Sequence, residues 1–362
     1  MSLADIITQR IQQEGPVSFS DFMEMALYYP ESGYYTSTED KIGVKGDFYT
    51  SSILTPAFGA MVGRQMEQMW DLLGREAFTI VEYGAGTGSL CHSILAYLKG
   101  NEPLYDKLEY CIIEKSPALR EKQEKALPEK VKWYNSIQDV PPITGCILSN
   151  EVVDNFAVHQ VVMEEELMEV FVDYEQGFVE VLKPAPKALT HYLNELKVQL
   201  PKGFRTEINL EATKWISDIA KALKKGYVIT IDYGGLSSEL YRESRSAGTL
   251  VCYHEHQVFD NPYQNIGEQD ITTHANFSAL IHWGLKAGLT CCGITSQGQF
   301  LTALGFSEYL MNNTDPGQDI IQAARKIALI NHTLLIDMGS KFKVLIQGKE
   351  TPEQDLTGLK RS

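Results

Sequence analysis

The sequence predicts an α/β fold in which a mostly parallel sheet carries helices on both faces. Apolar runs of strand length alternate with segments of helical periodicity between residues 78 and 150. Because parallel strands need a crossover connection, this alternation is typical of a parallel sheet. The run VEYGAGTGSL at 81–90 places a glycine turn between a strand and a helix. The 362 residues are enough for one large domain with insertions or for two domains.

The first half of the chain supplies most of this alternation. Residues 3–13 have helical periodicity, which ends at Gly15-Pro16, and a second helix is expected around 20–28. Residues 31–52 are rich in Gly, Ser, Thr and Asp and are expected to form an ordered loop. The elements expected next are helices at 55–73, 88–99 and 117–126 and strands at 78–83, 108–114, 131–134 and 145–150.

The alternation breaks after residue 156. Apolar and polar positions alternate over 157–183, which predicts an insertion of short antiparallel strands. Glu164, Glu165 and Glu166 fall at its expected turn, and we interpret them as a solvated tip rather than a metal site. The elements expected next are a helix at 205–224, a strand at 227–232, an irregular stretch at 234–273, a helix at 275–287, an apolar segment at 289–294, a helix at 317–328 and a strand near 342–347.

These patterns divide the chain into five parts. We expect an N-terminal helical segment with a lid loop at 1–75, the ligand-binding half of the core at 76–155, an inserted β-rich subdomain at 156–204, the rest of the core at 205–348 with an insertion at 234–273, and a polar, frayed tail at 349–362.

The composition excludes some classes of partner. The formal net charge of −15 repels phosphate backbones, so nucleic acid is not expected as a partner, and it suits either solubility or a cationic substrate. The six cysteines form no CxxC pair, and four lie in apolar runs, which favours a reducing compartment. The sequence contains neither an apolar run of membrane-spanning length nor a signal-peptide pattern. We therefore expect a cytoplasmic protein without a membrane partner.

The glycine turn is predicted to bind the polar end of a ligand. Free N–H groups at the start of a helix point outward, and Gly84, Gly86 and Gly88 allow a tight turn and close approach. The dinucleotide fingerprint GxGxxG would need glycine at position 89, which is Ser89, and an acid about twenty residues on. Here the next strand ends at Glu114, so the spacing disfavours a nicotinamide dinucleotide.

Glu82 favours a different ligand. A carboxylate two residues before the first glycine would repel pyrophosphate, but it suits S-adenosylmethionine, which carries an ammonium, a sulfonium and a ribose diol. The pattern [DE]xGxGxG resembles motif I of Rossmann-like methyltransferases, in which an acid at the position of Glu114 binds both ribose hydroxyls. The alternative is a structural turn without a ligand. The cofactor-binding residues implied are Glu82, Gly84, Ala85, Gly86, Gly88, Leu90, Glu114, Lys115, Ser116 and Ser149.

Longer stretches are more specific than the glycine turn. They are FSDFMEMALYYPESGYY (19–35), GDFYTS (46–51), VEYGAGTGSL (81–90), IEKSPALREKQ (113–123), SNEVVD (149–154), IDYGG (231–235), GTLVCYHEH (248–256), DITTHANF (270–277) and SQGQFLTALG (296–305). Through them the chain resembles, over roughly 15–347, the MidA-type family of S-adenosylmethionine-dependent methyltransferases, which includes the mitochondrial arginine methyltransferase that assists complex I assembly.

The resemblance implies a Rossmann-like class I methyltransferase fold. It implies a seven-stranded, mostly parallel sheet, an N-terminal helical segment, an inserted subdomain and protein arginine methylation, at least for the mitochondrial member. That member carries a presequence and this chain does not, which indicates a bacterial protein. Many members have a proline after the acidic motif, where this chain reads Asn155-Phe156-Ala157, so the shape of the acceptor pocket does not follow from the resemblance.

The acidic motif SNEVVDNF supplies candidates for methyl transfer. The protein must align the acceptor about 3–3.5 Å from the methyl group and exclude water. An arginine acceptor is charged, so carboxylates are needed to hold its guanidinium and help to remove a proton. Because strand ends at the carboxyl edge face the ligand crevice, Asn150, Glu151 and Asp154 are the candidate acceptor contacts. Alternatively, Asp154 caps a following helix and Asn150 bonds the loop backbone.

Other polar residues have competing interpretations. Asp47, Phe48 and Thr50 form part of a lid over the cofactor or a packed loop, and Asp232 faces the crevice or serves packing. Asp270 caps the next helix, the interpretation we favour slightly, or reaches the site. Thr272 and His274 are further candidates near the site, and Gln297 and Gln299 are candidate substrate contacts with weak support. Cys252, His254 and His256 have no fourth ligand at a zinc-like spacing, so we do not predict a metal site there.

The sequence therefore predicts a methyltransferase that uses S-adenosylmethionine and modifies arginine in a protein substrate. A small-molecule methyltransferase and a non-catalytic assembly factor that retains cofactor binding are the alternatives. A homodimer would use either the helix at 55–73 or the insertion at 157–183, and the sequence does not choose between them.

Overall fold

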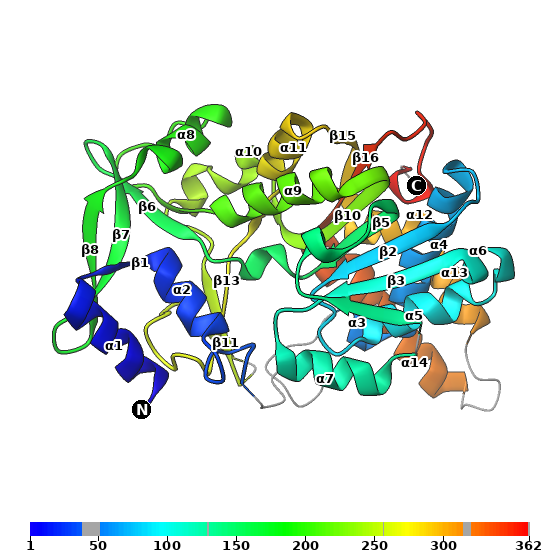
Figure 1. The fold of residues 1–362 in the computed structure, drawn as a ribbon, viewed down its shortest axis with the longest axis horizontal. Helices are drawn as coiled ribbons and strands as arrows, with labels where there is room; N and C mark the ends of the chain where they lie inside the picture. Colours follow the sequence, from blue (N-terminus) through cyan, green and yellow to red (C-terminus); the bar gives the residue numbers. More distant parts are fainter. Residues whose placement is uncertain (38–50, 129, 256, 314–319, 361–362) are drawn as a thin grey trace.

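The computed structural model describes residues 1–37, 51–128, 130–255, 257–313 and 320–360. Within these residues the main sheet has the order β15-β16-β10-β5-β2-β3-β4, and the short β14 pairs with β10 off this path. Figure 1 labels β15, β16, β10, β5, β2 and β3 in this sheet. Its strands are β2 (Phe78–Tyr83), β3 (Leu108–Ile113), β4 (Val131–Tyr134), β5 (Ile143–Asn150), β10 (Leu223–Gly235), β14 (Ala275–Asn276), β15 (Thr290–Ser296) and β16 (Phe342–Lys349).

The pairing confirms a mostly parallel sheet. Strands β2, β3, β4, β5 and β10 pair in parallel, whereas β16 is antiparallel to both β10 and β15. The path contains seven strands, but β14 makes eight among the described residues, because β10 extends beyond residue 232 and pairs with Ala275 and Asn276. In the register, Tyr83 lies opposite Ile113 and Ser149, so β2, β3 and β5 end at the same edge.

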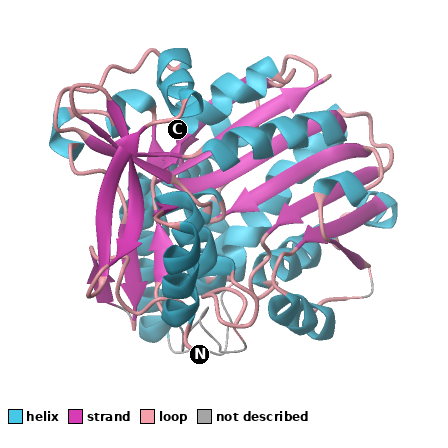
Figure 2. Cartoon of the chain, turned by 60° about the vertical axis from the view of Figure 1, so that its left-hand side comes forward, coloured by secondary structure: helices cyan, strands magenta, loops and turns pink. Residues whose placement is uncertain are grey.

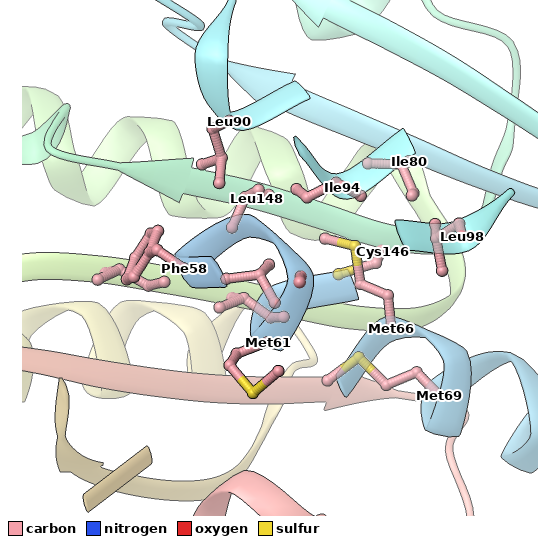
Figure 3. Packing of buried hydrophobic residues seen from close by; sticks show 14 of the residues in the cluster. Phe58, Met61, Met66, Met69, Ile80, Leu90, Ile94, Leu98, Cys146 and Leu148 are labelled. Atoms are coloured by element: carbon pink, nitrogen blue, oxygen red, sulfur yellow. The ribbon is translucent and has the colours of Figure 1, made fainter. Parts of the chain in front are cut away.

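Helices cover both faces of this sheet. On one face, α4 (Pro56–Leu72) and α5 (Ser89–Leu98) bury apolar side chains against the sheet, and Figure 3 shows Phe58, Met61 and Leu90 in this core. On the other face, α9 (Leu210–Ala222) and α11 (Phe277–Lys286) pack on the second core. Ile80 and Val81 point to opposite cores because successive strand residues alternate in direction.

A smaller sheet lies beside the main one (Figure 2). It comprises β1 (Val17–Ser18), β6 (His159–Met163), β7 (Leu167–Tyr174), β8 (Phe178–Pro184) and β9 (Arg205–Ile208), all paired antiparallel. The antiparallel strands predicted over 157–183 are therefore confirmed. Helices α1 (Leu3–Glu14) and α2 (Phe19–Tyr28) share a core with this sheet, because β1 pairs with β7.

Two expectations about local structure are wrong. The helix expected from 205 begins at Leu210, where Asn209 caps it by accepting the N–H of Ala212, and residues 205–208 form β9. The stretch 234–273 is not irregular throughout, because β11 (Val251–His254), β12 (Gln257–Phe259) and β13 (Asp270–Thr272) form a sheet of their own.

The described part of the tail is packed rather than frayed. Leu356 is 2% exposed, and the side chains of Gln65 and Gln68 accept the N–H groups of Gly358 and Thr357, both at 2.8 Å. These contacts attach the tail to α4. The prediction of a frayed tail, which was based on polar composition alone, is therefore wrong for the residues described.

The remaining α-helices lie at other places along the chain. They are α3 (Ser51–Leu54), α6 (Glu102–Lys107), α7 (Pro117–Ala126), α8 (Lys187–Glu195), α10 (Ser237–Leu240), α12 (Gln297–Ala303), α13 (Phe306–Asn312), α14 (Ile320–Asn331) and α15 (Met338–Lys341). Across the described residues, no helix combines the length and apolar character that a membrane crossing requires.

Candidate active site

A cavity of about 300 Å³ opens at the carboxyl ends of β2, β3, β4 and β5. The chain segments that follow these strands line it at 84–87, 114–116, 135–138 and 150–152. Tyr28 and Tyr35 from the N-terminal segment and Trp215 from α9 are also among the lining residues. The cavity therefore lies where parallel α/β sheets bind their ligands.

The glycine turn forms one end of the cavity. Gly84 has φ of +59° and its N–H donates to the carbonyl of Ile113 at 2.9 Å, which ties the turn to β3. A Cβ at Gly84 would come within 3.1 Å of Val152, whereas a Cβ at Gly86, φ +54°, would meet no atom within 4 Å. The backbone at Gly86 is therefore open to close approach by a ligand.

Glu82 lies in the cavity wall below this turn. It is 2% exposed, and the hydroxyl of Tyr110 donates to its carboxylate at 2.7 Å. Burial is the main reason that the pKa of Glu82 rises to about 7; the hydrogen bond from Tyr110 opposes the rise, and the charge of nearby Glu114 contributes to it. A bound cationic group would therefore stabilise the ionised form.

Glu114 follows β3 and is held through both carboxylate oxygens. The N–H of Ser116 donates to one oxygen at 2.9 Å, and the side-chain amide of Gln123 donates to the other at 3.0 Å. Burial raises the pKa of Glu114, and these two hydrogen bonds oppose the rise. The hydroxyl of Ser116 caps α7 by accepting the N–H of Leu119.

Neighbouring side chains extend the wall. The ammonium of Lys115 lies 3.3 Å from Glu211 and 4.9 Å from the ring centroid of Tyr28. Tyr28 and Tyr35 stack at a centroid distance of 5.6 Å, and both line the cavity. Ala85 and Leu90 are also in the lining.

The loop after β5 places Glu151 in the cavity. Its φ of +56° is rare for a non-glycine residue, and its N–H donates to the carbonyl of Ile231 at 3.0 Å. The backbone N–H of Ser51 and the side-chain amide of Asn150 each donate to the same carboxylate oxygen at 3.1 Å. Burial is the main reason that the pKa of Glu151 rises to about 7, and the charge of Asp232 adds to it.

Asp232 holds this loop in place. Its fully buried carboxylate accepts three successive backbone N–H groups, from Val152, Val153 and Asp154, at 2.9–3.3 Å. Its other oxygen accepts the N–H of Tyr233 at 2.9 Å. Asp232 does not line the cavity, so of the two interpretations the structural one holds. Burial raises its pKa to about 7.

Asp154 lies behind the cavity wall rather than in its lining. It is 4% exposed, and one carboxylate oxygen has no hydrogen-bond partner among the described residues. Burial raises the pKa of Asp154 well above its usual range, and the charges of Asp232 and Asp270 reinforce the rise. It caps no α-helix, because the chain continues through a short 3-10 turn into β6.

Two predicted cofactor contacts also lie outside the lining. Gly88 precedes α5 as its N-cap residue, and the buried hydroxyl of Ser149 has no partner among the described residues. The lid residues Asp47, Phe48 and Thr50 lie outside the described residues.

The candidates farther along the chain lie outside the cavity lining. Asp270 accepts from the side chains of Asn155 at 3.0 Å and Tyr35 at 2.9 Å, and it does not cap α11, because Asn276 does. The interpretation of Asp270 as a cap is therefore wrong. It supports two residues of the cavity wall instead.

Thr272 and His274 make local contacts. The hydroxyl of Thr272 donates to the carbonyl of Val251 at 3.2 Å. A guanidinium N–H of Arg245 lies 2.7 Å from Nδ1 of His274, and burial, with the charge of Arg245, lowers the pKa of His274 to about 4. The imidazole is therefore neutral at pH 7 and accepts this hydrogen bond.

The remaining polar candidates have other partners. The amide of Gln297 donates to the carbonyl of Leu334 at 3.4 Å, and Gln299 accepts from Thr295 at 2.8 Å. Cys252 is buried, and His254 contacts the carbonyl of Glu268. His256 lies outside the described residues, within which no group of three or more His, Cys, Asp or Glu is placed to hold a metal.

Several lining residues were not predicted. Those after β4, at 135–138, could have been found by the same rule that identified Glu82 and Glu114, since β4 ends at the same sheet edge. Tyr28, Tyr35 and Trp215 carry no such signal, because tertiary packing alone brings α2 and α9 to this edge.

The strand order, with a cavity at the carboxyl edge lined by a glycine turn and two acids, is that of a Rossmann-like α/β protein with a ligand site at this edge. Residues 61–295 match the model of the S-adenosyl-L-methionine-dependent methyltransferase family, and the chain belongs to this family. The protein is therefore a methyltransferase that uses S-adenosylmethionine.

Individual proteins are similar over almost the whole chain. A crystal structure from Burkholderia thailandensis, bound to S-adenosyl-homocysteine, is 30% identical with a TM-score of 0.90, and the match covers 99% of this chain and 95% of that one. The mitochondrial protein arginine methyltransferase NDUFAF7 homolog of Drosophila melanogaster is 26% identical over 95% of this chain and 84% of its own length. The Danio rerio NDUFAF7 protein is 25% identical over 94% and 86%.

The residues of the cavity fit this cofactor. Glu82 and Glu114 supply carboxylates for cationic and hydroxyl groups, and the open backbone at Gly86 leaves room for the ligand. The side-chain oxygen of Asn150 is buried without a partner among the described residues and belongs to the lining. These are the donor and acceptor types that S-adenosylmethionine requires.

Proposed function

We propose that this methyltransferase modifies arginine side chains in a protein substrate. The observation that carries the proposal is the Glu151 carboxylate, which lines the cofactor cavity beside Asn150. The similar NDUFAF7 proteins are named protein arginine methyltransferases, which supports the same acceptor.

Glu151 would hold and orient the acceptor. A guanidinium presents several N–H donors in one plane, so a carboxylate can bind it and draw its positive charge to one side. With a pKa of about 7, Glu151 is partly ionised at neutral pH and can accept a proton when the reaction releases one. S-adenosylmethionine, when bound, supplies a methyl group already activated by its sulfonium.

Other residues would bind the cofactor and exclude water. Glu114, which lines the cavity, would accept from the ribose hydroxyls, and Glu82 and the glycine turn would receive the polar amino-acid end. Tyr28 and Tyr35 present stacked rings on the same cavity and would cover the acceptor. The bacterial and cytoplasmic expectations, the homodimer and the five-part division of the chain stay predictions.

The experiment supplies an acceptor mixture and identifies the methylated residue. Purified protein is incubated with methyl-labelled S-adenosylmethionine and a heat-treated lysate of cells that lack this protein. The macromolecular fraction is then hydrolysed and its amino acids are separated. We expect the label in methylated arginine, at a rate that falls about 100-fold or more with Glu151→Gln. Label in another residue or in the small-molecule fraction, or no transfer at all, would contradict the proposal.

A further inference from the structure

Gln123 is a buried amide that joins the two halves of the cofactor site. One amide nitrogen donates to the carbonyl of Gly86 at 2.9 Å and to the carboxylate of Glu114 at 3.0 Å. The indole N–H of Trp133 donates to its oxygen at 2.9 Å. The side chain of one residue on α7 thus connects the glycine turn, the end of β3 and β4.

Packing alone does not explain a glutamine here. All of α7 lies within the described residues, and Gln123, with no exposed surface, is its one buried residue. A helix ordinarily buries an apolar side chain at such a position, since a buried amide costs free energy unless it is hydrogen-bonded. The amide nitrogen donates two hydrogen bonds and the amide oxygen accepts one, so the cost of burying this polar side chain is offset by these three bonds.

We propose that Gln123 is a positioning residue for the cofactor: it fixes the carboxylate of Glu114 and the glycine turn relative to each other. With Ser116 on one oxygen and Gln123 on the other, the carboxylate cannot rotate freely. Its remaining lone pairs stay directed by these two bonds, which reduces the ordering cost when the nucleoside binds.

The hydrogen bond from Gln123 also lowers the pKa of Glu114 against the effect of burial. The groups that face Glu114 are Glu82 from β2, the backbone N–H groups of Lys115 and Ser116, and Gln123 from α7. Loss of the amide therefore raises the pKa of Glu114. The carboxylate would become protonated, and lose affinity for the cofactor product, at a higher pH than in the parent protein.

The test measures binding of S-adenosylhomocysteine by calorimetry from pH 5 to 9. Gln123→Met keeps the volume and removes the amide, and we expect about tenfold weaker binding at pH 8, the usual effect of losing a hydrogen bond to a charged group. The acid limb of the affinity profile should move to higher pH. The matched control is Gln65→Met, another fully buried glutamine, whose partners are Gln68 and Gly358 of the tail. Its affinity profile should match the parent.

A double-mutant cycle separates positioning from general stability. If Gln123 acts through Glu114, adding Gln123→Met to Glu114→Gln should weaken binding by less than twofold beyond Glu114→Gln alone. Additive losses, or parent-like affinity in Gln123→Met, would overturn the proposal. If Gln123→Met does not fold, the variant to measure is Trp133→Phe, which removes the indole donor to Gln123. Trp133→Phe should weaken S-adenosylhomocysteine binding about threefold, and parent-like binding would overturn the proposal.

This inference rests on cofactor binding and not on the identity of the acceptor. Its readout is an affinity measured without methyl transfer, so its failure would leave the arginine proposal untouched. Conversely, a different acceptor would leave the role of Gln123 unchanged.

Discussion

Replacing Glu82 by glutamine should stabilise the protein at alkaline pH. The carboxylate is 2% exposed, and its pKa rises from an ordinary value of 4.5 to about 7. A folded-state pKa above the unfolded one means that the folded protein holds its proton longer. Stability is therefore lost as pH rises from 4.5 to 7. Glutamine cannot ionise, and its carbonyl oxygen can still accept from Tyr110.

The size of the effect follows from the two pKa values. The difference of about 2.5 units corresponds to about 3 kcal/mol above pH 7, at about 1.4 kcal/mol for each unit. At pH 5 the remaining penalty is below about 1 kcal/mol, because the folded carboxyl is almost fully protonated. The new amide N–H groups need partners, so we expect a net gain of about 1–3 kcal/mol at pH 8. Glu151 and Asp232 are present in both proteins, so their contributions to the pH dependence of stability cancel when the two free energies of unfolding are subtracted.

The assay is equilibrium urea unfolding of parent and Glu82→Gln at pH 5 and pH 8 without cofactor. The variant should gain stability relative to the parent only as pH rises. Tyr110→Phe is the matched control: it removes the hydrogen bond that favours the ionised form, so its stability should fall most at pH 8. A difference between parent and Glu82→Gln that is equal at both pH values would refute the reasoning.

Four further changes have defined outcomes. Glu114→Ala removes the carboxylate that we expect to accept two charge-assisted hydrogen bonds from the ribose. Calorimetry should then show more than tenfold weaker S-adenosylhomocysteine binding, and unchanged affinity would overturn the ribose assignment. Glu151→Gln should lower kcat about 100-fold or more with that affinity within threefold, and a parallel loss of both would argue against an acceptor role. Asp232→Asn should weaken the hydrogen bonds to the loop N–H groups and lower kcat about tenfold without loss of cofactor affinity. A parent-like kcat would mean that Asp232 does not position Glu151. Leu356→Ala should cost about 2–4 kcal/mol in urea unfolding because this tail residue is 2% exposed, whereas a cost below about 0.5 kcal/mol would mean a frayed tail.

The sequence by itself was sufficient for the sheet and for the acids at its edge. Strand β2 and helix α5 agree with the predicted ranges within a residue, because apolar periodicity depends on neighbouring positions. Glu82, Glu114 and Glu151 were found because each lies within two residues of the last residue of a strand, and the carboxyl ends of parallel strands meet at one edge.

Only the tertiary structure decided which residues support these acids. Gln123 looks like a surface residue in PALREKQEKA, yet it lies fully buried between Glu114 and Gly86. Asp270 and Tyr35 are 235 positions apart and share a hydrogen bond. No local pattern encodes such contacts, because they arise when packed elements bring distant segments together and every buried polar group must then find a partner. Periodicity and strand ends therefore predict the acids that line the cavity, whereas the hydrogen bonds that orient them exist only once the chain has folded.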